Sequence, residues 1–160
     1  MVEVLDTNVL VFANGQDGDD DCSFKASALL ADIQPEDVAV DVGGEIFSEY
    51  GRCVNSQVQN KVGPFLWALY NVARRVPITP DAEGSYSEFP THLELAEFPR
   101  KDRKFVAVAL KAGDHRLSAA SDYRAWGHHE TALVAAGINL NFICPHLMRL
   151  KDADAARRSN

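Results

Sequence analysis

The sequence predicts an α/β protein organised around a parallel β-sheet. Residues 2–5 (VEVL) form a short, mostly apolar, β-prone run that leads directly into Asp6 and then into a helix-compatible stretch, residues 7–13. Residues 38–42 alternate valine with other residues and carry an acid near their end. Short apolar runs followed by helices are typical of buried parallel strands, whose carboxyl ends form the sheet edge where ligands bind.

Hydrophobic spacing and chain breakers define the other elements of the first half. Apolar residues in 23–33 (SFKASALLADI) recur at helical spacing, and Pro35 ends this second helix. Two glycines at 43–44 form a turn, and residues 45–54 (EIFSEYGRCV) predict a third helix. Residues 57–75 are apolar on nearly all sides, which indicates a helix that is largely buried or that forms an interface.

The second half repeats this alternation after a proline-containing loop at 77–99. A helix begins with Asp102 in its first turn, because the apolar residues after it share one face. Residues 116–120 predict a short strand that leads into Asp122, and a further helix ends at Gly137. Residues 138–144 (INLNFIC) predict the last strand.

Size and composition fit a single globular domain. The chain has 160 residues, of which 46% are hydrophobic and 24% charged. No apolar run approaches the roughly 20 residues of a membrane span, and Glu3 and Asp6 interrupt any signal-peptide pattern, so we expect a cytoplasmic protein. Cys22, Cys53 and Cys144 are odd in number and far apart, which favours reduced core thiols.

The net charge of −7 excludes a protein that coats nucleic acid through a basic surface. It does not exclude an enzyme that acts on nucleic acid, since carboxylates gathered around divalent cations contribute to such an excess. A solvated acidic loop at 17–21 accounts for part of the charge.

Four acids stand where a parallel sheet would bring them together. Asp6 and Asp122 follow strands, Asp102 begins a helix, and Glu45 or Glu49 lies on the helix after the second strand. Taken alone, Asp6 could simply cap its helix, and the two glutamates could face water. Three or four carboxylates in one pocket, however, require cations, and Mg²⁺ or Mn²⁺ are the natural choice. Such ions activate water for phosphodiester hydrolysis.

Basic residues surround Asp102 in the sequence. They are Arg100, Lys101, Arg103 and Lys104. They could form a solvated helix start with weak ion pairs, or they could bind phosphate groups of a substrate.

At four points the residues resemble the motifs of the PIN-domain nuclease family. LDTNVL resembles the first motif, with Asp6 as ligand and Thr7 and Asn8 beside it. DVGGEIFSEYGRCV resembles the second, which favours Glu49 over its rival Glu45.

KDRKFVAVAL resembles the third motif and gives Asp102, and SAASDYRAW resembles the fourth and gives Asp122. Ser121 stands where a threonine or serine is usual. Arg124 stands where many members have a further acid, which leaves open whether a second ion is held.

The resemblance implies a three-layer α/β/α fold with a central parallel sheet of about five strands, a nuclease domain over residues 1–147 and a C-terminal tail at 148–160. It implies a Mg²⁺- or Mn²⁺-dependent endoribonuclease, often the toxin of a VapC-type toxin–antitoxin pair, that forms a homodimer and is inhibited by an antitoxin.

The expected roles follow from these matches. The metal ligands would be Asp6, Glu49, Asp102 and Asp122, with supporting contacts from Thr7, Asn8, Ser121 and Glu45. The residues for RNA phosphates would be Arg100, Lys101, Arg103, Lys104 and Arg124. The alternative is a catalytically degenerate binding or scaffold protein on the same fold. A phosphatase with Asp6 as nucleophile is disfavoured, because Asn8 occupies the place of its usual second aspartate.

Overall fold

The computed structural model describes residues 1–55, 57 and 60–147. The predicted C-terminal tail, 148–160, therefore lies outside the described residues. The strands are β1 (Val2–Leu5), β2 (Ala39–Asp41), β3 (Arg74–Val76), β4 (His115–Ala119) and β5 (Leu140–Phe142). The helices are α1 (Thr7–Ala13), α2 (Asp20–Asp32), α3 (Glu45–Cys53), α4 (Gly63–Val72), α5 (Arg103–Ala112) and α6 (Glu130–Ala135).

All strand pairs are parallel, as the sequence predicts, but the strands do not form one sheet. β1, β4 and β5 form a three-stranded sheet in the order β1–β4–β5, and β2 pairs only with β3. A single bridge between Glu3 and Val38 connects the two groups. The prediction of one sheet of about five strands is therefore wrong, because β2 and β3 have three residues each and regular pairing with β1 does not extend beyond that bridge.

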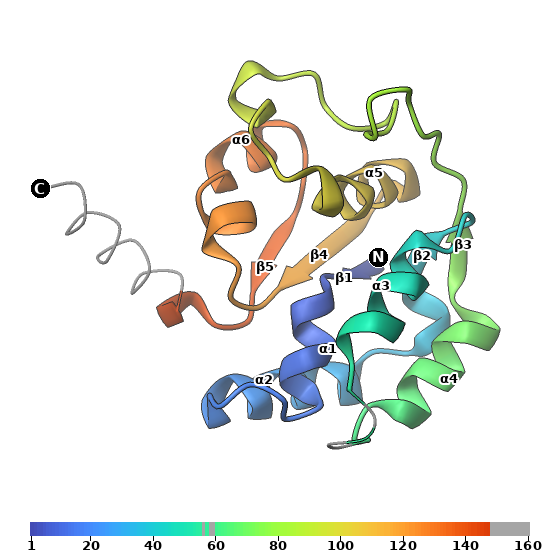
Figure 1. The fold of residues 1–160 in the computed structure, drawn as a ribbon, viewed down its shortest axis with the longest axis vertical. Coiled ribbons are helices and arrows are strands. Elements are labelled where there is room, and N and C mark those ends of the chain that lie inside the picture. The colour runs from blue at the N-terminus through green and yellow to red at the C-terminus, as the bar shows by residue number, and fades with distance from the viewer. Residues whose placement is uncertain (56, 58–59, 148–160) are drawn as a thin grey trace, which may run out of the picture.

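Helices cover the strands from both sides (Figure 1). α5 packs on β1, β2 and β4, and α1 lies on the other side with α2 and α3. The strand residues Val4, Leu5, Val40 and Leu117 are fully buried, as is most of α5. The carboxyl ends of β1 and β4 lie side by side, since the backbone N–H of Asp6 donates to the carbonyl of Ser118.

The turn before α3 explains why glycine occupies positions 43 and 44. Gly44 has a φ of 82°, a left-handed conformation that glycine adopts without steric cost. A Cβ at Gly43 would lie 3.1 Å from the Asp41 Oδ2 atom. That carboxylate accepts hydrogen bonds from the backbone N–H groups of Glu45 and Ile46, both at 2.8 Å, and so caps α3.

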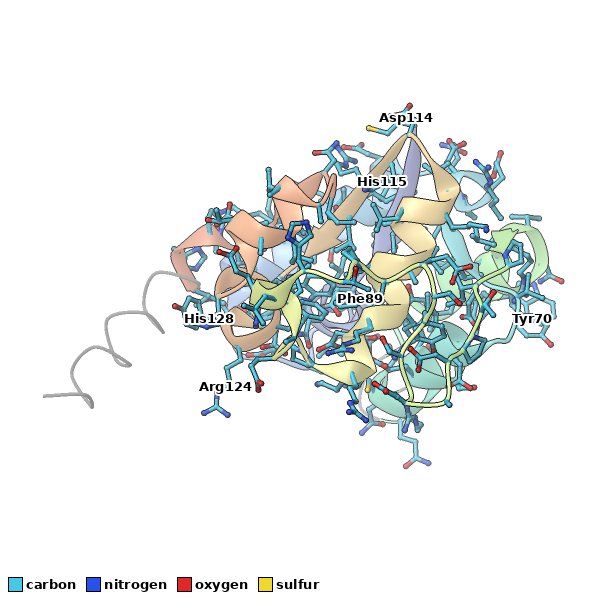
Figure 2. All side chains as sticks on the ribbon, turned by 90° about the horizontal axis from the view of Figure 1, so that it is seen from above. Tyr70, Phe89, Asp114, His115, Arg124 and His128 are labelled. Carbon is cyan, nitrogen blue, oxygen red and sulfur yellow. A yellow bond between two sulfur atoms is a disulfide. The ribbon has the colours of Figure 1, made fainter. Side chains whose placement is uncertain are left out.

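α4 is shorter and more exposed than the sequence predicts. It starts at Gly63, and among its residues only Leu69 is fully buried. Trp67 and Tyr70 are 71% and 63% exposed. Of the two alternatives for this helix, burial is therefore wrong for these residues, and an interface stays a prediction. Tyr70 stands at the periphery of the molecule (Figure 2).

The cysteines also differ from the expectation. Cys22 at the start of α2 and Cys144 after β5 form a disulfide, and Cys53 is exposed. The prediction of three reduced core thiols is therefore wrong, because elements 122 residues apart in the chain meet at this point. No helix in the described ranges has the length and apolar character needed to cross a bilayer.

Candidate metal-binding site

The structure brings together four of the acids that the sequence singles out. Asp6 follows β1, Asp122 follows β4, Asp102 ends a 3₁₀ turn directly before α5, and Glu49 lies in the middle of α3. The other three carboxylates each raise the pKa of Asp6 electrostatically. These four residues form the acidic site.

Asp6 is the most deeply placed acid of the acidic site. Its side chain is 3% exposed, and its Oδ2 atom has no hydrogen-bond partner in the structure. Burial raises the pKa of Asp6 to about 8, and the charges of Asp102, Asp122 and Glu49 add to this effect. Without a cation, the Asp6 carboxyl group is therefore largely protonated at neutral pH.

Asp102 has a similar environment, with cations nearby. It is also 3% exposed, and its Oδ2 atom also has no partner. Burial raises its pKa to about 6, an effect that Lys101 and Lys104 oppose and that Asp122 and Glu49 increase. Two buried carboxyl oxygens without partners thus belong to the same site.

Of the two glutamates on α3, Glu49 belongs to this site and Glu45 does not. The Thr7 hydroxyl donates to Glu49 Oε1 at 2.7 Å, and the Lys104 ammonium forms an ion pair with Glu49 Oε2. Both oxygens of Glu49 are therefore occupied. Glu45 is exposed, and its carboxylate acts on the pKa of Tyr86 rather than on that of Asp6.

The remaining predicted residues lie around the rim. Asp122 is half-buried, and its Oδ1 atom accepts from the backbone N–H of Ala125 at 3.2 Å. Ser121 precedes it and is half-buried, as is Asn8 in the first turn of α1. Arg124 is exposed and points away from the molecule (Figure 2), so its side chain lies apart from the four acids.

The four basic residues around Asp102 separate into two pairs. Lys104 is buried against Glu49, and Lys101 is exposed beside Asp102, whose charge raises the pKa of Lys101. The two arginines instead hold the loop that precedes α5.

Arg100 donates to the carbonyl of Glu83 at 2.7 Å. Arg103 donates to the carbonyls of Phe98 and Ala96 and lies over the Phe89 ring. Of the four, only Lys101 is exposed and beside the acids, and so only Lys101 is free to meet a substrate there.

Tyr50 supports the acidic site through a backbone contact that the sequence does not predict. It is buried, and its hydroxyl donates to the carbonyl of Leu5 at 2.7 Å, which fixes α3 to the end of β1. Burial and the neighbouring acids, Asp6 first among them, raise its pKa well above the usual value. Its position directly after Glu49 is the only sequence signal of this role.

The donor set fits a hard divalent cation. Carboxylate oxygens are the ligands that Mg²⁺ and Mn²⁺ prefer, and Asp6 and Asp102 each offer a buried oxygen without a partner. No three of the four carboxylates, all within the described residues, bring their oxygens within 4.8 Å of one another. An ion held here would therefore take at most two of these carboxylates directly and would complete its coordination with water, as Mg²⁺ commonly does.

The comparisons with known proteins give one distant structural likeness. A solved structure, "Structure of FitAB bound to IR36 DNA fragment", aligns with 89% of this chain and 95% of its own, at 16% identity and a TM-score of 0.48. Neither the family models nor the curated proteins contain a match. The function proposed below therefore rests on the geometry of the site.

Proposed function

We propose that the protein is a Mg²⁺- or Mn²⁺-dependent endoribonuclease that hydrolyses RNA phosphodiester bonds. The observation that carries this proposal is the pair of buried, unpartnered carboxyl oxygens on Asp6 and Asp102. Burying an acid without a partner costs free energy, which protonation reduces and a bound cation removes. A site that retains this cost in the metal-free chain is a candidate functional site.

Asp6 and Asp102 would supply the metal ligands, and Asp122 would take part from the rim. A bound Mg²⁺ or Mn²⁺ supplies Lewis-acid chemistry, which activates water and stabilises the charge that develops on the phosphodiester. Thr7 and Lys104 hold the Glu49 carboxylate in a fixed position. There its charge adds to the effect of burial in raising the pKa of Asp6.

Lys101 is the residue best placed to bind a substrate phosphate. It is exposed, its ammonium lies beside Asp102, and the acids favour its charged form. A phosphate bound by Lys101 would lie next to the acidic site. Arg100, one residue earlier, is engaged with Glu83 and serves as a matched control.

The test is cleavage of structured and single-stranded RNA, with DNA in parallel, in Mg²⁺, Mn²⁺ or EDTA. We expect metal-dependent RNA cleavage that is lost in Asp6→Asn and retained in Glu45→Gln, which changes an exposed acid outside the site. Lys101→Ala should raise KM far more than Arg100→Ala does. Equal cleavage by Asp6→Asn and the parent would contradict the proposal.

A second candidate is a non-catalytic RNA-binding protein on the same fold. The observation that favours it is the full occupation of Glu49 by Thr7 and Lys104, which removes one potential metal ligand. Such a protein would bind RNA through Lys101 without cleaving it, and Mn²⁺ would not raise its melting temperature.

Protein partners are also part of the proposal. The exposed Trp67, Tyr70 and Val72 on α4 give an apolar surface that supports homodimer formation or binding of an antitoxin-like protein. Light scattering of the parent and of Trp67→Glu tests the dimer. A monomeric parent at micromolar concentration would leave antitoxin binding as the remaining role for this surface.

A further inference from the structure

A second cluster of potential metal ligands shares no residue with the acidic site. Asp19 and Cys22 stand at the start of α2, and Cys144 and His146 follow β5. The His146 Nε2 atom is 3.4 Å from Asp19 Oδ2, and the ligand atoms of Asp19, Cys22 and His146 all lie within 4.8 Å of one another. Together with Cys144, the disulfide partner of Cys22, these residues form the Cys22–Cys144 cluster.

The donor types in this cluster match zinc. Zn²⁺ takes four ligands in a tetrahedral arrangement, and thiolate, imidazole and carboxylate are its usual donors. In the disulfide the two sulfurs carry no thiolate. Reduction adds two electrons and two protons and gives two thiols, and loss of those protons on metal binding gives two thiolate ligands.

We propose that this cluster, once its disulfide is reduced, binds one Zn²⁺ ion through two thiolates, one imidazole and one carboxylate. The reductant is a thiol or phosphine, and the zinc ion does not change its oxidation state. A disulfide oxidant, which accepts the two electrons and is itself reduced to two thiols, converts the two thiolates back to the protein disulfide and releases the ion. The acidic site takes no part in this proposal.

Local structure places a carboxylate beside the Cys22 sulfur. Cys22 is the third residue of α2, and Asp19 is the N-cap of that helix. Its backbone N–H donates to Asp19 Oδ1 at 2.8 Å, which fixes the carboxylate next to the sulfur. Both cysteines are fully buried, whereas Asp19 and His146 are solvent-accessible and leave a path for the ion.

The exchange of disulfide for zinc would preserve one structural link. The disulfide joins α2 to the segment after β5 across 122 residues. A shared metal ion would join the same two segments in reducing conditions, so the chain would keep this cross-link in both states.

The test uses the full chain, reduced with a phosphine under inert gas and titrated with Co²⁺ as a spectroscopic probe. We expect one equivalent of Co²⁺ to saturate a thiolate-to-cobalt charge-transfer band and the intense visible bands of tetrahedral Co²⁺, both removed by Zn²⁺. The oxidised chain should show neither. A reduced chain without the charge-transfer band, or an oxidised chain with it, would overturn the proposal.

Variants separate this site from other metal binding. Cys22→Ser should abolish the charge-transfer band, and Cys53→Ser, the matched change at the exposed cysteine, should retain it. His146→Ala, at an accessible position that leaves the fold intact, should raise the Kd for Co²⁺ by about tenfold or more. Asp6→Asn should bind as the parent does, so failure of the nuclease proposal would not affect this result. A band that depends on Cys53 would refute the assignment.

Discussion

Replacement of Asp6 by asparagine should stabilise the metal-free protein at neutral pH and leave it nearly unchanged at acidic pH. Burial and three neighbouring acids raise the pKa of Asp6 from 3.8 to about 8. Between these values the folded chain holds a proton on Asp6 that the unfolded chain has lost. The free energy of unfolding of the parent therefore falls as the pH rises from about 4 to about 8.

The magnitude follows from the same pKa values. Each tenfold difference in proton affinity corresponds to about 1.4 kcal/mol, so the cost at about pH 7 is on the order of 4 kcal/mol. An asparagine at this position cannot ionise, and its buried amide is similar in polarity to the protonated carboxyl group that it replaces. We therefore expect Asp6→Asn to gain on the order of 4 kcal/mol at about pH 7 and almost nothing at about pH 4.

Urea denaturation in EDTA across this pH range measures the effect, with the disulfide intact in every sample. Asp41→Asn is the matched control: Asp41 is a buried acid as well, but its carboxylate caps α3 through two backbone N–H groups. It should lose about 1 kcal/mol at neutral pH rather than gain stability. If the free energy of unfolding changes with pH in the same way in the parent and in Asp6→Asn, the raised pKa of Asp6 is refuted.

Three further predictions concern the groups around Asp6. Mn²⁺ should raise the melting temperature of the parent by an amount that grows with Mn²⁺ concentration. The Asp102→Asn variant should show little shift in the same thermal scan. An equal shift in both proteins would mean that the ion binds elsewhere. Lys104→Met should lower the free energy of unfolding by about 3–5 kcal/mol at neutral pH, because it leaves the Glu49 carboxylate buried without its cation. Adding Glu49→Gln should recover most of that loss in urea melts, and additive losses would show that the two side chains do not interact. Tyr50→Phe should cost about 1–3 kcal/mol, since the carbonyl of Leu5 loses its buried donor; a neutral effect would mean that this contact is not formed.

The convergence of the four acids follows from chain order, whereas their role as metal ligands stays a prediction. A short apolar run that ends in an acid and continues as a helix leaves few options for Asp6, and a similar pattern applies to Asp122 after β4. The carboxyl ends of parallel strands meet at one edge, so convergence follows from topology. The choice of Glu49 over Glu45 rested on a motif, and the structure separates them because α3 turns one face toward β1.

Other features depended on partners that are distant in the chain. Adjacent basic residues look equivalent in the sequence, yet Arg100 and Arg103 bind the preceding loop while Lys101 and Lys104 approach the acids. The direction of each of these side chains depends on the orientation of the 3₁₀ turn at Arg100–Asp102. Hydrophobic spacing in the sequence does not reveal that orientation. The exposure of Trp67 could not be predicted either, because an apolar helix face has the same pattern whether it meets the core or a partner molecule.

The hydrogen bond from the Tyr50 hydroxyl to the carbonyl of Leu5 links α3 to β1. It lies directly beside two acids, because Tyr50 follows Glu49 and Leu5 precedes Asp6. Ionisation of Asp6, whose pKa burial and the neighbouring acids raise to about 8, therefore places a negative charge next to the contact between α3 and β1. When the pH rises and no cation is present, amide hydrogens of α3 should exchange with solvent faster than those of α5, beyond the intrinsic effect of pH. Loss of the proton from Asp6 would thus cause local opening of α3.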